Sequence, residues 1–275
     1  MVVQHNLTAA NTNRQLGITT SGLQKSTEKL SSGYKINRAA DDAAGLSISE
    51  KMRNQIRGLN KASDNAQDGI SLVQTAEGAL NEVHSMLQRM SELAVQSANG
   101  TNATADRTAL DNEVQQLKTE IQRVGSTTQF NKMNILDGNF SSGKKKNLQV
   151  GANANQTISI AISALKSVVG SSLLEKLKIG TATNAQSAIT TVQSSIEKLS
   201  KLRSKLGAVQ NRLEHTVANL DNISENTQSA ESRIRDTDMA EEMVQYSKNN
   251  ILQQAGQSML AQANQANQGV LSLLQ

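Results

Sequence analysis

The chain has 275 residues and a net charge of +4, with no proline, cysteine or tryptophan. Because cysteine is absent, disulfide bonds and thiolate metal sites are excluded. Aromatic side chains make up only 1% of the residues, so aliphatic side chains and alanine must supply the buried area of any core.

The first 33 residues predict a helix at the N-terminal end. Leu16, Leu23 and Leu30 are spaced by seven before Gly33, which is the periodicity of a helical seam. Residues 1–13 contain no Lys or Arg and no sustained apolar run, so we expect no cleaved signal peptide. No stretch of about 18 apolar residues occurs, and we expect neither a transmembrane helix nor a membrane partner.

The longest predicted helix runs from Ala43 to Ala98, and the absence of proline allows it to continue unbroken. Asp41 and Asp42 precede it, which we interpret as N-capping residues rather than a catalytic carboxylate pair. At 1.5 Å per residue this helix is about 84 Å long. Its apolar positions form two rows of sevenfold spacing: Leu59, Ala66, Val73, Leu80, Leu87 and Ala94, then Ala62, Gly69, Ala76, Val83 and Met90. A second helix is predicted at about 105–125.

The middle of the chain, residues 131–183, predicts a small β-rich cap. Apolar residues alternate with small ones from Ile158 to Ile162, and Leu148–Val150 precedes a glycine, which are strand signals. Lys144–Lys146 is a basic cluster that we interpret as a solvated turn. Contact with nucleic acid is the alternative, but base stacking needs aromatic residues, which are nearly absent.

A second long helix is predicted from Asn184, a plausible N-cap, to Ala230. Its apolar positions are again spaced by seven: Val192, Leu199, Leu206, Leu213 and Leu220. Two long helices with complementary seams are best buried against each other. The sequence therefore predicts a mainly α fold built on a long antiparallel helical bundle or coiled coil.

The C-terminal segment predicts another helix, which would pair with the N-terminal one. Apolar positions spaced by seven are Leu252, Met259, Ala266 and Leu273. No charged side chain follows Lys248, although a helix that faces water usually carries charges on its outer side. We therefore expect a helix surrounded by other helices in an assembly. In the isolated chain we expect both terminal segments to be loose, because short helices bury too little apolar surface.

The elements are nested around the middle of the chain, which predicts a division into four parts. Residues 1–33 and 238–275 form terminal outer helices, and residues 34–42 and 231–237 are spacers. Residues 43–130 and 184–230 form a helical rod domain, and residues 131–183 form the cap.

The sequence offers little that points to catalysis. The three histidines, His5, His84 and His215, are far apart and lack the spacing of a zinc protease helix. No glycine-rich phosphate loop or activated nucleophile is visible, so we expect no enzyme, metal or cofactor. A basic helical nucleic-acid-binding protein is the alternative from another functional class. It would need clusters of Lys and Arg beyond Lys144–Lys146.

Several long segments resemble the two ends of bacterial flagellins. They are Lys29–Leu46, Glu50–Gly58, Gln67–Ala79, Leu206–Leu213, Ala230–Asp236 and Lys248–Leu252. The resemblance implies a structural subunit that polymerises into the flagellar filament for swimming motility, in a short form without the large outer domains. A hook–filament junction protein is the alternative, and it would be expected to match poorly over Glu50–Ala79.

The resemblance also implies a location and a set of partners. The chain would be exported unfolded through the flagellar channel, folded under a cap protein at the filament tip, and located outside the cell. Its terminal helices would line the inner tube of the filament. Further implied partners are the export apparatus, a chaperone and the hook–filament junction protein.

One surface resembles the flagellin patch bound by an animal innate immune receptor. By that resemblance the contact residues are Arg89, Glu92, Leu93, Gln96 and Glu113. We give greater weight to subunit packing by the same face. The sequence also departs from the family pattern, because lysine occupies position 132, where glycine is usual, and the local turn is expected to differ.

Overall fold

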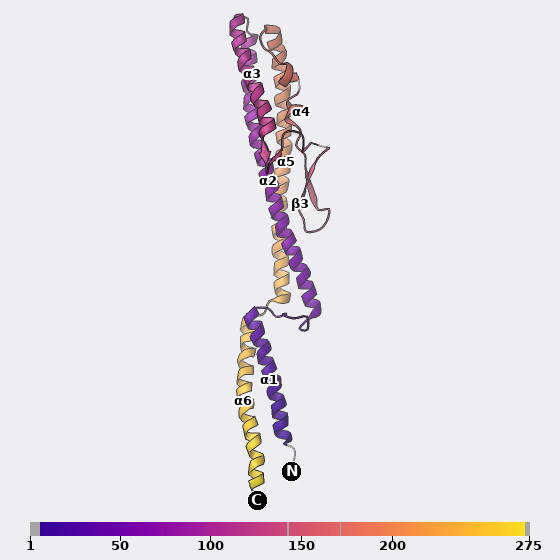
Figure 1. Ribbon diagram of the computed structural model, residues 1–275, viewed down its shortest axis with the longest axis vertical. Helices are drawn as coiled ribbons and strands as arrows, with labels where there is room; N and C mark the ends of the chain where they lie inside the picture. Colours follow the sequence, from indigo (N-terminus) through magenta and orange to yellow (C-terminus); the bar gives the residue numbers. More distant parts are fainter. Residues whose placement is uncertain (1–5, 142, 171, 273–275) are drawn as a thin grey trace. The chain divides into compact units, whose positions relative to one another are not determined.

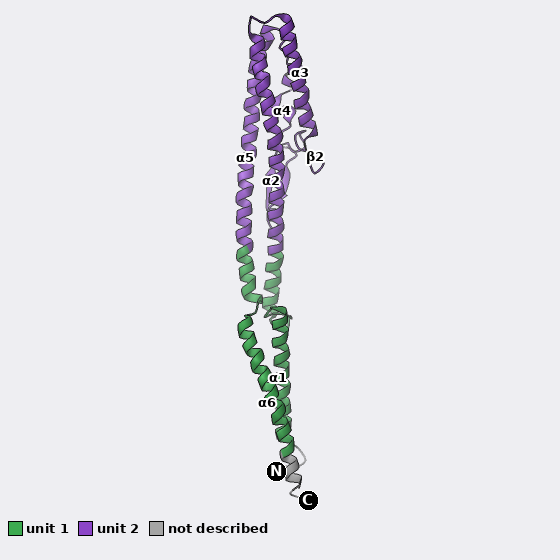
Figure 2. Cartoon of the chain, turned by 90° about the vertical axis from the view of Figure 1, so that its left-hand side faces the viewer, with its two compact units in different colours: residues 1–55, 225–275 green, residues 56–224 purple. Residues whose placement is uncertain are grey.

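The computed structural model describes residues 6–141, 143–170 and 172–272 and is mainly helical (Figure 1). The chain divides into two compact units (Figure 2). Unit 1 comprises residues 1–55 and 225–275, and unit 2 comprises residues 56–224. The predicted fold class, a long antiparallel helical bundle with a small β-rich part and paired terminal helices, is confirmed.

Unit 1 contains the two terminal helices, α1 (Leu7–Ser32) and α6 (Met239–Ser272), which pack against each other in antiparallel orientation. The side-chain amide of Asn6 donates to the carbonyl of Ala263 at 3.0 Å, and the Lys29 ammonium pairs with the Glu242 carboxylate at 3.4 Å. Half-buried or buried side chains follow a three–four spacing on both helices. They are Ala9, Thr12, Leu16, Thr19, Leu23, Ser26 and Leu30 on α1, and Glu242, Tyr246, Asn249, Gln253, Gly256, Leu260 and Ala263 on α6.

The seam between α1 and α6 contains many small and polar residues. A Cβ atom on Gly256 would lie 3.3 Å from the Leu16 side chain, and one on Gly22 would lie 3.3 Å from Asn249. Glycine at these positions therefore lets the two helices approach closely. The loose terminal segments expected from the sequence are not what the structure shows, because each helix supplies the other with a continuous partner.

The segment between α1 and α2 (Ala43–Ala98) is held by backbone contacts and caps. Gly33 ends α1 with a φ of 75°, the left-handed conformation that glycine adopts without strain. The Asp42 carboxylate accepts a hydrogen bond from the Gly45 amide at 2.9 Å, so its predicted capping role is confirmed. Asp41 instead accepts from the backbone amides of Arg38 and Asn37, and these bonds lower the pKa of its carboxyl group.

The return segment is shorter than the predicted spacer 231–237. Helix α5 (Ala182–Arg235) continues through most of that range. The backbone of Tyr34 pairs with that of Asp236, and the Arg235 guanidinium lies 4.6 Å from the centre of the Tyr34 ring. A cation over an aromatic face is attracted by the ring, so the end of α5 has tertiary contacts that keep it helical.

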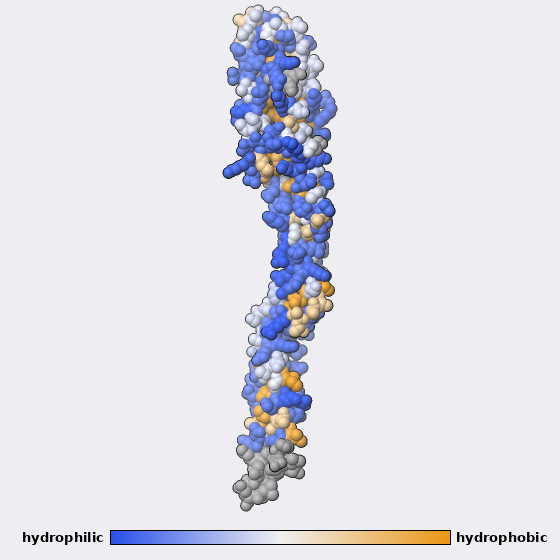
Figure 3. All heavy atoms as spheres, turned by 45° about the vertical axis from the view of Figure 1, so that its right-hand side comes forward, coloured by the Kyte–Doolittle hydropathy of each residue, from blue (hydrophilic) through white to orange (hydrophobic). Residues whose placement is uncertain are grey.

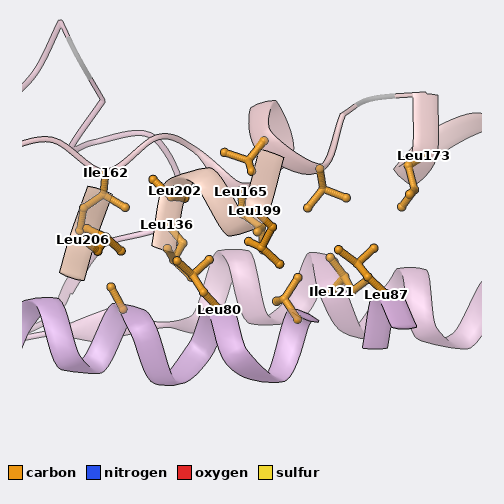
Figure 4. Packing of buried hydrophobic residues seen from close by; sticks show 14 of the residues in the cluster. Leu80, Leu87, Ile121, Leu136, Ile162, Leu165, Leu173, Leu199, Leu202 and Leu206 are labelled. Carbon is orange, nitrogen blue, oxygen red and sulfur yellow. The ribbon is translucent and has the colours of Figure 1, made fainter. Parts of the chain in front are cut away.

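Unit 2 is built on the antiparallel pair formed by α2 and α5, with α3 (Thr104–Thr127) packed alongside. Both predicted rows of α2 and the sevenfold row of α5 are buried. Most of their apolar side chains share one cluster with Val114 and Ile121 of α3, while Leu59, Ala62 and Leu220 form a second, smaller cluster. Figure 4 shows leucines of α2 and α5 and Ile121 directed toward one another. Leu80 and Leu87 have no exposed surface. The predicted aliphatic core is therefore present.

Polar contacts join α2 and α5 where the apolar seam thins out. The Ser63 hydroxyl donates to Asp221 at 3.1 Å, and the Ser224 hydroxyl donates to Asn60 at 2.7 Å. Both serines are buried, with less than a tenth of their surface exposed. A buried hydroxyl without a partner is costly, so these contacts occur in only one alignment of the two helices.

The cap consists of two small hairpins and two short helical turns. Strands β1 (Gln129–Phe130) and β2 (Met133–Asn134) form one antiparallel pair, and β3 (Lys146–Gln149) and β4 (Thr157–Ile160) form the other. The alternating face of β4 is buried as predicted, through Ile158 and Ile160. The sequence reading missed α4 (Leu165–Val169) and the π-helical turn η1 (Ser172–Lys176), because each is only five residues long.

The start of α5 and the segment before it are anchored by polar side chains. Asn184 is not the N-cap, because α5 begins at Ala182 and the Thr181 hydroxyl accepts from the Asn184 amide at 3.2 Å. The Lys118 ammonium donates to the carbonyl of Leu177 at 3.1 Å. Burial lowers the pKa of Lys118.

The tight turn between β1 and β2 places two non-glycine residues in the left-handed region. Asn131 has a φ of 48° and Lys132 a φ of 60°. Two-residue hairpins of this kind favour Asn-Gly, because glycine tolerates positive φ. The hairpin therefore forms although position 132 is lysine, and the difference expected there is that this lysine has a strained backbone.

We expect Lys132→Gly to stabilise the protein by about 1 kcal/mol, because glycine removes the penalty of a left-handed lysine. Denaturant unfolding measures the change. Lys132→Gln is the matched control, since it keeps a Cβ atom at the same φ and should leave stability unchanged. Equal stability of the glycine and glutamine variants would contradict the argument from strain.

Candidate functional site

Unit 1 has almost no apolar core of its own. The side chains of unit 1 are described for residues 6–55 and 225–265. Among them, Ile36 is the only apolar side chain that is buried. Nine large apolar side chains of the unit are instead exposed: Leu7, Ile18, Ile48, Met239, Met243, Val244, Ile251, Leu252 and Met259. Figure 3 shows orange patches on the part of the chain formed by α1 and α6. Exposed apolar surface of this extent marks an interaction site.

The predicted apolar row of α6 does not face α1. Leu252 is 48% exposed and Met259 is 58% exposed, while the seam toward α1 passes through Tyr246, Gln253 and Leu260. The helix therefore directs a mixed row of polar, small and a few large side chains at its partner and leaves most of its large apolar ones uncovered. Nothing is described for the side chain of Ala266, and Leu273 lies outside the described residues.

The predicted row of α1 lies elsewhere. Leu16, Leu23 and Leu30 are half-buried and belong to the seam with α6, so they pack within the chain. The exposed apolar side chains of α1 are Leu7 and Ile18.

Sequence reasoning also missed two exposed apolar residues of α6, Val244 and Ile251, each 66% exposed. They are seven apart, and this second row was a signal that could have identified them. No Asp, Glu, Lys or Arg follows Lys248 in the sequence. Over the described part of α6 beyond that residue, the exposed surface is therefore uncharged. Covering it would not require the desolvation of an ion, which costs several kcal/mol.

The second candidate surface lies on α2 and α3 in unit 2. The Arg89 guanidinium donates to Glu113 at 2.8 Å and to Glu92 at 3.1 Å, so the structure brings these three predicted residues together. Their side chains are about half exposed, and Gln96 is exposed beside them. The hydrogen bond to Glu113 raises the pKa of Arg89.

Leu93 differs from the other four residues predicted for this surface. Its side chain has no exposed area and belongs to the apolar cluster shared by α2, α3 and α5. A partner on the outside cannot touch it. Leu93 therefore supports the surface from beneath, and its assignment as a contact residue is corrected.

A shallow hollow beside Arg89 extends this surface toward α5. It is lined by Gln88, Ser91, Glu92, Val95, Gln96 and Ile196. Val95 is 56% exposed, although its neighbours Leu93 and Ala94 on the same helix are fully buried. The sequence pattern did not single out Val95 because it lies outside the sevenfold rows.

We expect Leu93→Lys to destabilise unit 2 by about 3 kcal/mol or more, because it places an ammonium group in an apolar cluster. Gln96→Lys, three residues away and exposed, is the matched control and should change stability by less than about 0.5 kcal/mol. Chemical denaturation followed by circular dichroism measures both. Similar midpoints for the two variants would show that Leu93 is not buried.

Comparison with known proteins identifies the family. Family models described as the bacterial flagellin N-terminal helical region and C-terminal helical region match residues 3–141 and 189–274. The chain is 57% identical over 274 residues to a flagellin of Halalkalibacterium halodurans, and all of both chains is covered. The chain belongs to the bacterial flagellin family.

Other flagellins and flagellar filament proteins are similar over their full length. The identity is 49% over 304 residues to a flagellin of Bacillus subtilis, and 49% over 288 residues to the flagellar filament 31.3 kDa core protein of Treponema maltophilum. All of both chains is covered in each case.

Solved structures are similar as well. A crystal structure of Bacillus cereus flagellin matches with a TM-score of 0.51 and 31% identity, over 57% of this chain and 88% of that chain. A putative flagellar hook-associated protein of Vibrio parahaemolyticus has a TM-score of 0.61 but only 11% identity, over 71% of this chain and all of that one, which shows the fold alone.

As a flagellin, the chain is a structural subunit of the flagellar filament and assembles with copies of itself. The hook–filament junction protein considered as an alternative is not favoured. The predicted short form, without large outer domains, is confirmed, because this chain and the Halalkalibacterium halodurans flagellin match over the full length of both. None of the described helices holds a window apolar enough to cross a membrane. No group of His, Asp and Glu suited to binding a metal occurs among the described residues.

Proposed function

We propose that the exposed apolar side chains of α1 and α6 are the surface through which copies of this flagellin contact one another at the centre of the filament. One observation carries the proposal: unit 1 buries a single apolar side chain, Ile36, among its described residues and exposes nine large ones. A folded unit of this kind gains much of its apolar burial only from other chains.

The energetic argument concerns α6 above all. Full burial of one Ile, Leu, Val or Met side chain stabilises by about 1.5–3 kcal/mol. Met243, Val244, Ile251, Leu252 and Met259 are each about half or more exposed. Burying several of them offsets the loss of translational and rotational freedom on association, which costs on the order of 4–15 kcal/mol.

A membrane surface is the competing partner for an apolar helix face. Helices that lie on membranes usually carry Lys and Arg on their polar side, because these residues attract anionic lipids. Beyond Lys248, the sequence of α6 has no such residues. The composition therefore favours packing against other helices.

We also propose that the surface containing Arg89, Glu92, Gln96 and Glu113 is a second subunit contact, and that the animal innate immune receptor for flagellin binds the same face. Support comes from the ion pairs that hold Arg89 between Glu92 and Glu113, and from the exposed Val95 in the adjoining hollow. An apolar anchor beside an ordered Arg is typical of binding surfaces. Leu93 takes part only by fixing this part of α2 in place.

The family relationship extends the proposal to the route of assembly. The chain would pass unfolded through the flagellar export apparatus with a chaperone. It would then fold under the cap protein beyond the hook–filament junction protein. In the filament, residues 1–33 and 238–275 would form the inner tube. Residues 131–183 would occupy the position that the large outer domains have in longer flagellins.

We expect the double variant Ile251→Asn and Leu252→Asn to raise the critical concentration for polymerisation at least tenfold. The loss of two apolar contacts corresponds to about 1.4 kcal/mol or more per subunit. Sedimentation of filaments over a concentration series measures it. Gln257→Asn, also exposed on α6, is the control and should polymerise normally. A normal critical concentration for the double variant would refute the assignment of this face.

Deletion of residues 252–275 should abolish polymerisation and leave unit 2 folded. The buried cluster of unit 2 lies between Ala66 and Leu213 and includes no residue of α6. Negative-stain microscopy detects filaments, and the thermal midpoint of the truncated chain reports on unit 2. Normal filaments from the truncated chain would contradict the proposal.

A further inference from the structure

A hollow on the cap of unit 2 is lined by four lysines and has not been assigned a role above. Its volume is about 680 Å³. The lining residues are Gln129, Lys132, Met133, Asn134, Asn139, Phe140, Lys144, Lys145 and Lys146. The hollow thus joins the β1–β2 hairpin to the basic segment that leads into β3.

The charge of this hollow is one-sided. No carboxylate lines it, and the four lysines form no ion pair with the described residues. The only acidic residue between residues 128 and 164 is Asp137, whose carboxylate accepts hydrogen bonds from the backbone and side-chain amides of Asn139. Lysines gathered around one concave surface raise the local concentration of anions.

Two further observations suggest that this arrangement is more than a solvated turn. Lys132 has a φ of 60°, a strained conformation that glycine would relieve, and it is one of the residues that line the hollow. Strain of this kind tends to occur at functional sites. In addition, Gln129 is exposed in the lining, so its side-chain amide is available to a hydroxyl group of a ligand.

We propose that this hollow, defined by Lys132, Lys144, Lys145 and Lys146, binds acidic polysaccharides, that is, glycans that carry sulfate or carboxylate groups. The ammonium groups would neutralise the anionic groups. The exposed side-chain amide of Gln129 suits sugar hydroxyls because it both donates and accepts, and the side-chain oxygen of Asn139 is a further acceptor. Lys144, Lys145 and Lys146 are exposed to solvent, as the sequence reading expected, and the proposal adds a ligand to this turn.

Other anionic macromolecules fit the hollow less well. Single-stranded nucleic acid binds through aromatic platforms, and the only aromatic side chain in the lining, Phe140, is buried beneath Lys146. Insertion into a lipid surface needs several exposed apolar side chains, and Met133 is the only exposed large apolar residue in the lining. A hydroxyl-rich anionic chain matches both the charges and the amides.

Direct binding to a sulfated glycan tests the proposal. Full-length monomeric protein is titrated with fluorescent heparin oligosaccharide at low ionic strength, with uncharged dextran as the negative probe. The double variant Lys144→Gln and Lys145→Gln should bind about 25-fold more weakly, since one basic side chain at an anionic surface changes affinity about fivefold. Lys198→Gln with Lys205→Gln removes the same charge from exposed sites on α5 and should bind normally.

Two substitutions at Lys132 separate binding from stability. Lys132→Gly and Lys132→Gln should both weaken glycan binding about fivefold, because each removes one ammonium group. Only the glycine variant should also gain stability, as described above. A glycine variant that is more stable yet binds less would confirm that the strained lysine serves the ligand.

The results that would overturn the proposal are specific. Equal weakening by the hollow and α5 double variants would show that only net charge attracts the glycan. Tighter binding to duplex DNA or to phosphatidylserine vesicles than to heparin, at matched anionic charge, would assign the hollow to another macromolecule. Failure of wild-type protein to distinguish heparin from dextran would remove the site altogether. None of these outcomes bears on polymerisation, which involves different residues.

Discussion

The aliphatic seam between α2 and α5 is the contact on which the rest of unit 2 depends. Side chains at sevenfold spacing on both helices are fully buried, and α3, the hairpins and α4 all add their apolar residues to the same cluster. Without aromatic side chains, a long seam of Leu, Val and Ala is the way in which this composition buries enough surface. The apolar residues of the cap pack against the same cluster that α2 and α5 form between them.

Unit 1 follows the opposite rule. Its two helices meet through half-buried leucines mixed with small and polar residues such as Gly22, Gly256 and Asn249, and most of their other large apolar side chains lie on the outside. The chain therefore divides its apolar surface between a part that is satisfied within the molecule and a part that is left for copies of itself. For a polymer subunit this division is sensible, because the monomer folds its rod alone and still has a reason to associate.

Periodicity predicted the helices far better than it predicted what they face. The bounds of α2 matched because a long sevenfold pattern, a capping Asp42 and an Asn-Gly stop all agree. The pattern could not tell an intramolecular seam from an exposed row, since both have the same spacing. Leu252 was therefore assigned correctly to an apolar row, while its exposure and the seam through Gln253 required coordinates. Leu93 shows a limit of the resemblance instead, because a matched segment includes every position of the helix, whether its side chain is exposed or, like that of Leu93, fully buried.

The two serine contacts between α2 and α5 have a consequence for how the rods find each other. A seam that repeats every seven residues looks nearly the same after one helix slides by a heptad, so apolar packing alone would tolerate misaligned states. A slip of that size would separate Ser63 from Asp221 and Ser224 from Asn60 and leave buried hydroxyls unpaired. Two weak polar contacts thereby select one axial alignment of α2 and α5. That alignment also fixes where along the rod the residues of one helix lie relative to those of the other.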